Sequence, residues 1–186
     1  GVRGVADVDR LLRAGADKCS VNSAAVREPG IIDEIARRFG NQVLVLSVDA
    51  KRTGNTASGF EITTHGGRRL TGIDAVDWAR EGASRGAGEI LLNSMDADGT
   101  KQGFDLRMLA VVRAVVDVPV IASGGIHNLG DIKALLDAKA PGIIGAITGR
   151  AILLQPEVLR AVLGQRVELD EGPFVEQRQN PFTRGQ

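Results

Sequence analysis

Short apolar segments alternate with longer segments of helical period along most of this chain. The short segments are rich in β-branched residues, which is typical of strands buried on both faces of a sheet. Five strands are predicted, at residues 17–22, 42–49, 90–94, 118–123 and 142–148. Amphipathic helices are expected at residues 5–14, 29–39, 74–85, 106–116, 129–138 and 156–163. Alternation of this kind predicts a parallel sheet in an α/β protein.

A long, turn-rich segment follows the second predicted strand. Thr53-Gly54-Asn55 provides a turn, and Phe60-Glu61-Ile62-Thr63 has the character of a short strand. We therefore expect a small hairpin before the helix at residues 74–85. In (β/α)8 barrels, which are built from such alternating strands and helices, long loops after strands often carry the functional residues.

Two parts of the chain resemble each other. Residues 1–16 match residues 125–140 at a constant offset in their glycine, aspartate, leucine and alanine positions. If the fold consists of two such halves, the counterparts of residues 42–123 should precede Gly1, and they are absent. We therefore expect an incomplete (β/α)8 barrel that lacks its first two or so units, about 80 residues of a ~250-residue fold. The alternative is convergence of both parts on a common strand–helix pattern.

Composition favours one domain that acts on a small molecule. The chain has 186 residues, 43% of them hydrophobic, and its 23 lysines and arginines balance 23 aspartates and glutamates. Balanced charge provides no general attraction for nucleic acid or for an anionic membrane. We expect the barrel over residues 1–164 and a solvated polar tail at residues 165–186.

Several features favour a cytoplasmic protein without a metal or other cofactor. Cys19 is the single cysteine, cannot form an intrachain disulfide, and is expected to pack in a strand. His65 and His127 fall in separate loops, and two scattered histidines do not make a metal site. No hydrophobic run approaches the roughly 20 residues that span a bilayer. The first residues lack an initiator methionine and a signal peptide, so they look like an internal start.

Carboxylates follow two of the predicted strands. Asp49 ends the strongest apolar strand, and Asp96 and Asp98 follow the next one. The carboxyl ends of barrel strands form the mouth where active sites are built, and a carboxylate beside apolar walls can be tuned as an acid or a base. The alternatives are that Asp49 pairs with Lys51 or Arg52 or caps a turn, and that Asp98-Gly99 is a simple turn.

Small residues after the last two predicted strands indicate a phosphate site. Ser123-Gly124-Gly125 follows one strand and Thr148-Gly149-Arg150 the next. Small side chains allow a close approach, helix N-termini supply amide donors, and barrels of this class often bind phosphate here. Gly1 with Asn22-Ser23 is the equivalent in the first repeat. A substrate with a phosphate at each end would fit both sites.

Five motifs occur in the order found in one enzyme family. They are residues 16–25 (ADKCSVNSAA), 48–52 (VDAKR), 64–68 (THGGR), 86–92 (GAGEILL) and 96–101 (DADGTK). Through them, from Gly1 to about Gly125, the chain closely resembles the cyclase subunit of imidazole glycerol phosphate synthase, from histidine biosynthesis. From about Ile126 it is more similar to the sister isomerase of that pathway, most clearly at residues 145–152.

The resemblance implies a lyase. Ammonia from a partner glutaminase would travel through the barrel and attack a bis-phosphorylated ribulosyl formimino carboxamide ribotide. The products would be imidazole glycerol phosphate and an aminoimidazole carboxamide ribotide. Of the family's two acid–base aspartates, Asp49 matches the one on the fifth strand, whereas the one on the first strand would lie in the missing segment. Asp98 matches a further active-site carboxylate.

The resemblance also implies where the substrate binds. Together with the small-residue segments, it gives a set of substrate- and phosphate-binding residues: Asn22, Ser23, Asn93, Ser123, Gly124, Gly125, Thr148, Gly149 and Arg150. Asn93 stands where the cyclase usually carries threonine. Lys18 and Glu89 match charges at the opposite, ammonia-entry face.

Two other functions stay open. One is the ring-opening reaction of the sister isomerase, against which the cyclase-like residues around Asp49 and residues 96–101 argue. The other is a non-catalytic barrel piece that self-associates, because the strands at residues 17–22 and 142–148 would expose unpaired edges. We expect a homo-oligomer in solution.

Overall fold

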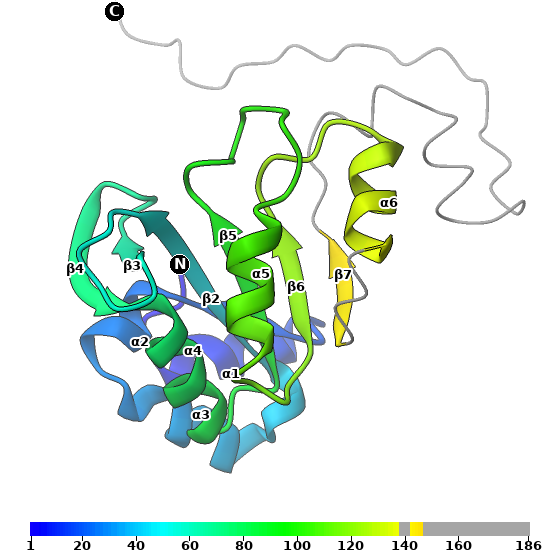
Figure 1. The fold of residues 1–186 in the computed structure, drawn as a ribbon. Coiled ribbons are helices and arrows are strands. Elements are labelled where there is room, and N and C mark those ends of the chain that lie inside the picture. The colour runs from blue at the N-terminus through cyan, green and yellow to red at the C-terminus, as the bar shows by residue number, and fades with distance from the viewer. Residues whose placement is uncertain (138–141, 147–186) are drawn as a thin grey trace, which may run out of the picture.

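The computed structural model describes residues 1–137 and 142–146 (Figure 1). Its helices are α1 (Val5–Arg13), α2 (Ser23–Arg27), α3 (Gly30–Phe39), α4 (Ala75–Ser84), α5 (Leu106–Arg113) and α6 (Leu129–Asp137), with a short 3-10 turn at Asn41–Val43. Its strands are β1 (Cys19–Val21), β2 (Leu44–Arg52), β3 (Phe60–Thr64), β4 (Arg69–Asp74), β5 (Glu89–Ser94), β6 (Val120–Ser123) and β7 (Ile143–Ala146). The helix predicted at residues 156–163 and the tail at residues 165–186 lie outside the described residues.

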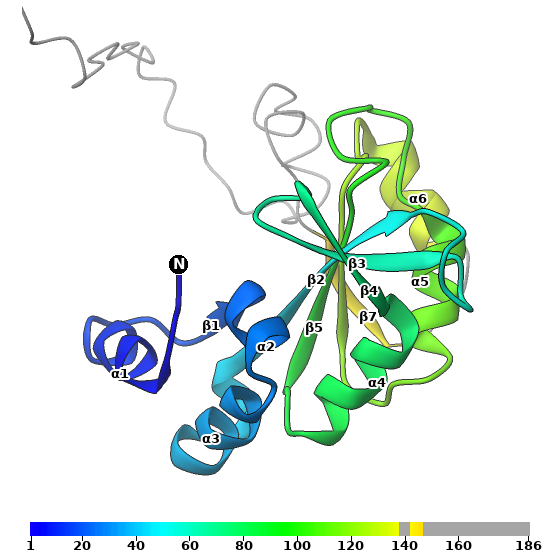
Figure 2. The same ribbon diagram turned by 90° about the vertical axis from the view of Figure 1, so that its left-hand side faces the viewer.

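One sheet organises these elements. Its order is β4-β3-β2-β5-β6-β7, with β1 beside β2. The strands β1, β2, β5, β6 and β7 run parallel, as the alternation of strands and helices predicts. In Figure 2, helices α1 to α3 lie beside β1, α5 and α6 lie on the opposite side, and α4 lies between them, against β2, β3, β4 and β5. A complete (β/α)8 barrel has eight parallel strands, so the described residues form a partial barrel.

The expected hairpin is present and longer than the sequence predicts. β2 continues past Asp49 to Arg52 because its last residues pair antiparallel with β3, and β3 pairs in turn with β4. The sequence did not predict β4, because this strand is largely exposed and lacks an apolar stripe. Nor did it predict α2, whose five residues are too few to show a helical period.

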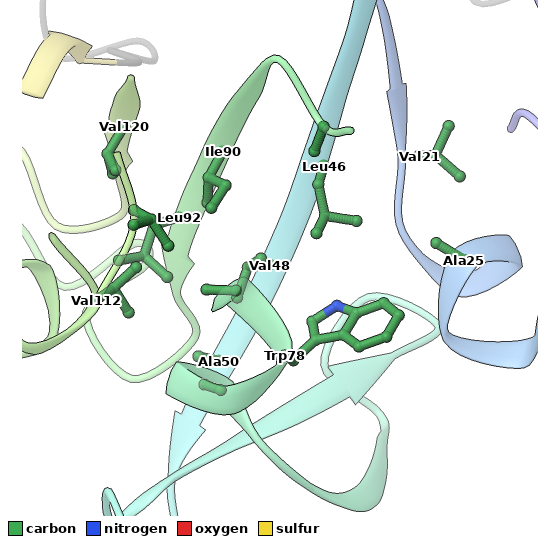
Figure 3. Close-up of a cluster of buried hydrophobic side chains, with 14 of the residues drawn as sticks. Val21, Ala25, Leu46, Val48, Ala50, Trp78, Ile90, Leu92, Val112 and Val120 are labelled. Atoms are coloured by element: carbon green, nitrogen blue, oxygen red, sulfur yellow. The ribbon is translucent and has the colours of Figure 1, made fainter. Parts of the chain in front are cut away.

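The core lies between the parallel strands and the helices that cover them. Leu46 and Val48 of β2 pack with Ile90 and Leu92 of β5, and Trp78 of α4 closes over them (Figure 3). All five side chains are buried. In β5, buried positions alternate with half-buried ones, whereas the sequence pattern predicts burial on both faces.

Cys19 is buried in β1, in agreement with the expected packing role. Burial raises the pKa of its thiol, which makes the nucleophilic thiolate scarcer. In the described part of the chain, no helix combines the length and the apolar character needed to cross a membrane.

Leu46→Ala tests the core. Leu46 is fully buried and its side chain fills the space beside Gly82. We expect the free energy of unfolding to fall by about 2–5 kcal/mol. Leu70→Ala, at a side chain that is 53% exposed in β4, is the matched control and should change it by less than about 0.5 kcal/mol. Urea titration of both variants measures the two values, and equal losses would contradict this account of the core.

Candidate functional site

Three predicted site residues lie in one row at the carboxyl ends of adjacent strands. Asp49 of β2 is level with Asn93 of β5, and Asn93 is level with Ser123 of β6. The arrowheads of these strands point to the same end of the sheet in Figure 1. The parallel register thus brings the three residues together at the mouth, where barrels of this class build their sites.

The carboxylate of Asp49 is held from both sides. The Nδ2 of Asn22, at the end of β1, donates to its Oδ2 at 2.6 Å. The Nδ2 of Asn93 and the hydroxyl of Ser47 donate to its Oδ1 at 3.4 and 3.5 Å. The hydroxyl of Thr63 in β3 fixes the main chain by donating to the Asp49 carbonyl at 3.0 Å. An ionised carboxylate only accepts hydrogen bonds, so these donors fix the orientation of the Asp49 carboxylate.

Asp49 makes no ion pair in the described part of the chain, which removes one alternative reading of this residue. The side-chain oxygens of Asn22 and Asn93 are buried, and no donor reaches them within the described residues. A buried acceptor without a donor costs about 1–3 kcal/mol. Both oxygens are therefore suited to a small group that carries N–H or O–H beside Asp49.

Ser23 begins α2, and its hydroxyl accepts a hydrogen bond from the main-chain N–H of His65 at 3.4 Å. His65 has a positive φ of 56° in the loop after β3, and its Nδ1 lies 3.0 Å from the Thr64 hydroxyl. The structure thus brings His65 next to the expected phosphate residues, which sequence reasoning missed. The available signal was the THGGR motif at residues 64–68.

The turn after β6 leaves no room for side chains. Gly124 and Gly125 have φ values of +93° and +95°. A Cβ on Gly124 would lie 2.7 Å from the Ser94 carbonyl oxygen, and one on Gly125 would lie 2.0 Å from the Gly103 carbonyl oxygen. Gly103 also donates its N–H to the Gly125 carbonyl at 2.8 Å. Glycines are therefore required here, because other parts of the backbone fill the space where a side chain would lie.

Asp98 lies in the loop after β5, where its main-chain N–H donates to the Ser94 carbonyl at 2.9 Å. Gly99 follows with a φ of +74°, as in the turn that the sequence alone allowed. The Asp98 side chain is exposed, and within the described residues no hydrogen bond joins it to Asp49. The predicted Thr148, Gly149 and Arg150 lie outside the described residues.

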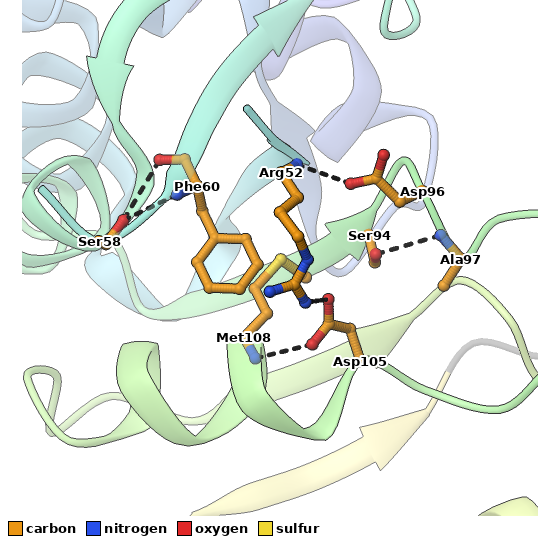
Figure 4. Close-up of polar contacts among 8 residues, drawn as sticks. All are labelled: Arg52, Ser58, Phe60, Ser94, Asp96, Ala97, Asp105 and Met108. Atoms are coloured by element: carbon orange, nitrogen blue, oxygen red, sulfur yellow. Dashed lines mark hydrogen bonds and ion pairs between the residues drawn. The ribbon is translucent and has the colours of Figure 1, made fainter. Parts of the chain in front are cut away.

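Arg52, Asp96 and Asp105 form a cluster that the sequence did not reveal. It joins the end of β2 to the loop between β5 and α5 (Figure 4). Arg52 ends β2, and its main-chain N–H donates to Asp96 at 2.6 Å. Its guanidinium donates to Asp105 at 2.6 Å and lies 4.6 Å from the centre of the Phe60 ring. Asp105 also caps α5 by accepting the N–H of Met108 at 3.0 Å. The cluster gathers residues far apart in the sequence.

Lys18 and Glu89 meet at the opposite end of the strands from the mouth. They lie at the amino ends of β1 and β5 and form an ion pair. A groove of about 560 Å³ runs beside β1 and α1, and Lys18, Cys19 and Ser20 line part of it. Among residues 1–137 and 142–146, no three His, Cys, Asp or Glu side chains form a group that could hold a metal ion.

The sequence matches the family model described as "Histidine biosynthesis protein" over residues 1–156. Three similar curated proteins are each named imidazole glycerol phosphate synthase subunit HisF. Those of Kocuria rhizophila and Salinispora tropica are 64% identical over 146 and 148 residues, and that of an Arthrobacter species is 63% identical over 150 residues. Each match covers 78% of this chain and 58% of the relative, so the chain spans less than two thirds of these proteins.

Proposed function

Because this chain belongs to the histidine biosynthesis protein family, we propose that it forms the greater part of the cyclase subunit of imidazole glycerol phosphate synthase. The complete cyclase is then a lyase. It combines ammonia with a bis-phosphorylated ribulosyl formimino carboxamide ribotide and releases imidazole glycerol phosphate and an aminoimidazole carboxamide ribotide. The observation that carries this proposal is the row of Asp49, Asn93 and Ser123 at the mouth, in a chain similar to proteins of that name.

In this proposal Asp49 transfers protons during ring closure. Its carboxylate already lies between the amides of Asn22 and Asn93, so it needs little reorganisation before reaction. The family's second acid–base aspartate comes from a strand outside this chain. Asp98 contributes a further carboxylate from the neighbouring loop.

The two phosphates are held at opposite sides of the mouth. The turn of Ser123, Gly124 and Gly125, together with residues 148–150, takes one phosphate, and Asn22 with Ser23 takes the other. Support for the first site comes from the place of this glycine turn, directly after β6 and level with Asn93 at the mouth. Support for the second comes from the place of Ser23, which follows β1 at the mouth and lies beside the loop of His65.

Substrate binding and turnover by the purified chain test this function. The chain is mixed with the bis-phosphorylated substrate and an ammonium salt, calorimetry measures binding, and chromatography measures both products. We expect binding, and ammonia-dependent product formation where the mouth is complete. Binding without turnover would identify a cyclase-derived scaffold, and absence of both would contradict the proposal. Formation of the isomerase product from the preceding intermediate would favour the sister enzyme.

We further propose that a glutaminase docks on the face where Lys18 and Glu89 pair, and that the protein works in the cytoplasm. Ammonia would enter the barrel there, at the amino ends of β1 and β5. Support comes from the ion pair, which holds both charges together at the amino ends of these strands.

Self-association is a separate expectation. Among the described residues, β1 pairs only with β2 and β7 only with β6, so each leaves an unpaired edge. Pairing such edges between chains satisfies their backbone groups. We expect a dimer or larger species in light scattering at micromolar concentration, and a monomer would contradict this.

A charged residue on the β1 edge should shift this equilibrium toward monomer, because charges block edge-to-edge pairing. Ser20→Lys places the charge at the exposed position of β1. Ser84→Lys makes the same change at the exposed end of α4, away from the edges, and should leave the assembly unchanged.

A further inference from the structure

Arg52 lies at the mouth but its charge is already engaged. The guanidinium pairs with Asp105, whose side chain is 12% exposed, and it stacks over the buried ring of Phe60 (Figure 4). Charge-assisted hydrogen bonds and cation–π contacts together fix the position of the arginine head group. Arg52 is therefore suited to holding other parts of the protein in place.

Arg52 holds the loop between β5 and α5 near both of its ends. Its main-chain N–H binds Asp96 at the start of the loop, and its guanidinium binds Asp105 at the end. Between these two points lie Asp98 and Gly103. Because Arg52 is still paired with Phe60 of β3, it gives the loop a rigid support.

The loop in turn supports the glycine turn after β6. Gly103 donates its N–H to the Gly125 carbonyl at 2.8 Å. The same loop lies so close that a Cβ on Gly125 would come within 3.0 Å of the Ala97 Cβ. A displacement of the loop would therefore displace the turn. Contacts thus run without a gap from Arg52 to the phosphate cradle.

We propose that Arg52 is a positioning residue that holds the loop of residues 95–103, and through it the turn at residues 123–125, in the conformation that binds the substrate's phosphate. This inference rests on the proposed function, because it takes the turn to be a phosphate site. It assigns no direct contact between Arg52 and the phosphate. The main-chain bond to Asp96 does not depend on the side chain, so the effect of the Arg52 guanidinium passes through Asp105 and Gly103.

The test measures two properties of the full chain, the affinity for inorganic phosphate and the amide hydrogen exchange of the loop. Arg52→Ala should weaken phosphate binding about tenfold, a typical effect of a displaced supporting element. It should also accelerate exchange at residues 97–103, because local opening becomes easier. Arg52→Lys should recover part of both losses, since it keeps the charge but not the planar fork.

Two further variants separate positioning from charge and from misfolding. Lys51→Ala removes the same charge from the exposed neighbour of Arg52, whose ammonium joins no ion pair within residues 1–137 and 142–146. It should change phosphate affinity less than twofold, about the size of a screened surface charge. Asp105→Asn keeps a capping oxygen for Met108 but weakens the pair with Arg52. It should show a smaller loss in the same direction, and it replaces Arg52→Ala if that variant does not fold.

Different results would overturn the positioning role of Arg52 and the phosphate site itself. Equal phosphate affinity in Arg52→Ala and the unchanged chain, or an equal loss in Lys51→Ala, would overturn the positioning role while leaving the phosphate site intact. If the unchanged chain binds no phosphate, the proposed function loses its phosphate site and the inference falls with it. The exchange data would then show whether Arg52 still anchors the loop.

Discussion

Replacing Asp49 with asparagine is expected to lower kcat for the ammonia-dependent reaction by roughly 10²–10⁴-fold, the usual contribution of a general acid or base. Asparagine has nearly the same shape but cannot take up or release the proton. Its amide oxygen can still accept from Asn22, and the Asn93 amide can turn to present its oxygen to the new NH₂ group. The fold should therefore be retained, and the substrate Kd should change less than about tenfold.

Steady-state kinetics measure kcat of this variant, and thermal unfolding shows whether it keeps the fold. Asp77→Asn is the matched control, because it makes the same chemical change on the exposed face of α4, where Asp77 pairs with Arg80. That control should keep its kcat within about twofold, since exposed ion pairs contribute little. A similar kcat in both variants would remove Asp49 from the chemistry.

Gly125→Ala is expected to weaken phosphate binding about a hundredfold, as misplacement at a binding site can do. The new Cβ would lie 2.0 Å from the Gly103 carbonyl oxygen, a backbone atom that cannot move aside. The positive φ of +95° adds strain for any L-residue with a side chain. We expect the turn to shift and the free energy of unfolding to fall by about 1–3 kcal/mol.

Gly54→Ala separates the clash from the backbone strain. Gly54 has a φ of +71°, but nothing lies within 4 Å of its future Cβ. This control should lose about 1 kcal/mol of stability from strain alone and keep its affinity for inorganic phosphate. Calorimetric titration with phosphate compares the two variants. A Gly125→Ala chain that binds phosphate normally would show that the turn is not the cradle.

Local patterns could predict Asp49 and Ser123 at the mouth, whereas Asn93 was predicted from the family resemblance. Apolar runs locate the strands, and parallel strands that end at one edge place their last residues side by side. The observed strand bounds differ from the predicted ones by a few residues, mainly where β2 continues into the hairpin. This continuation depends on pairing with β3, which the apolar pattern of β2 does not contain.

The contacts that position Asp49 could not be predicted in the same way. The family resemblance predicts that Asn22 binds phosphate. In the structure the side-chain amide of Asn22, at the end of β1, donates to Asp49 in β2. The cluster of Arg52, Asp96 and Asp105 depends on the end of β2 meeting the loop between β5 and α5. No spacing in the sequence encodes such a meeting, because side-chain partners far apart along the chain are set by tertiary packing.

The position of β2 in the sheet constrains how the chain assembles. It is the strand to which β1, β3 and β5 all attach. Without it, the described sheet separates into a lone β1, the β3–β4 hairpin and the β5–β6–β7 group. Only the contact with β3 is local. The parallel partners β1 and β5 lie farther away in the sequence, and pairing between distant segments forms slowly. β2 is thus the template on which three independent segments register, and Asp49 acquires its neighbours only after all of them have docked.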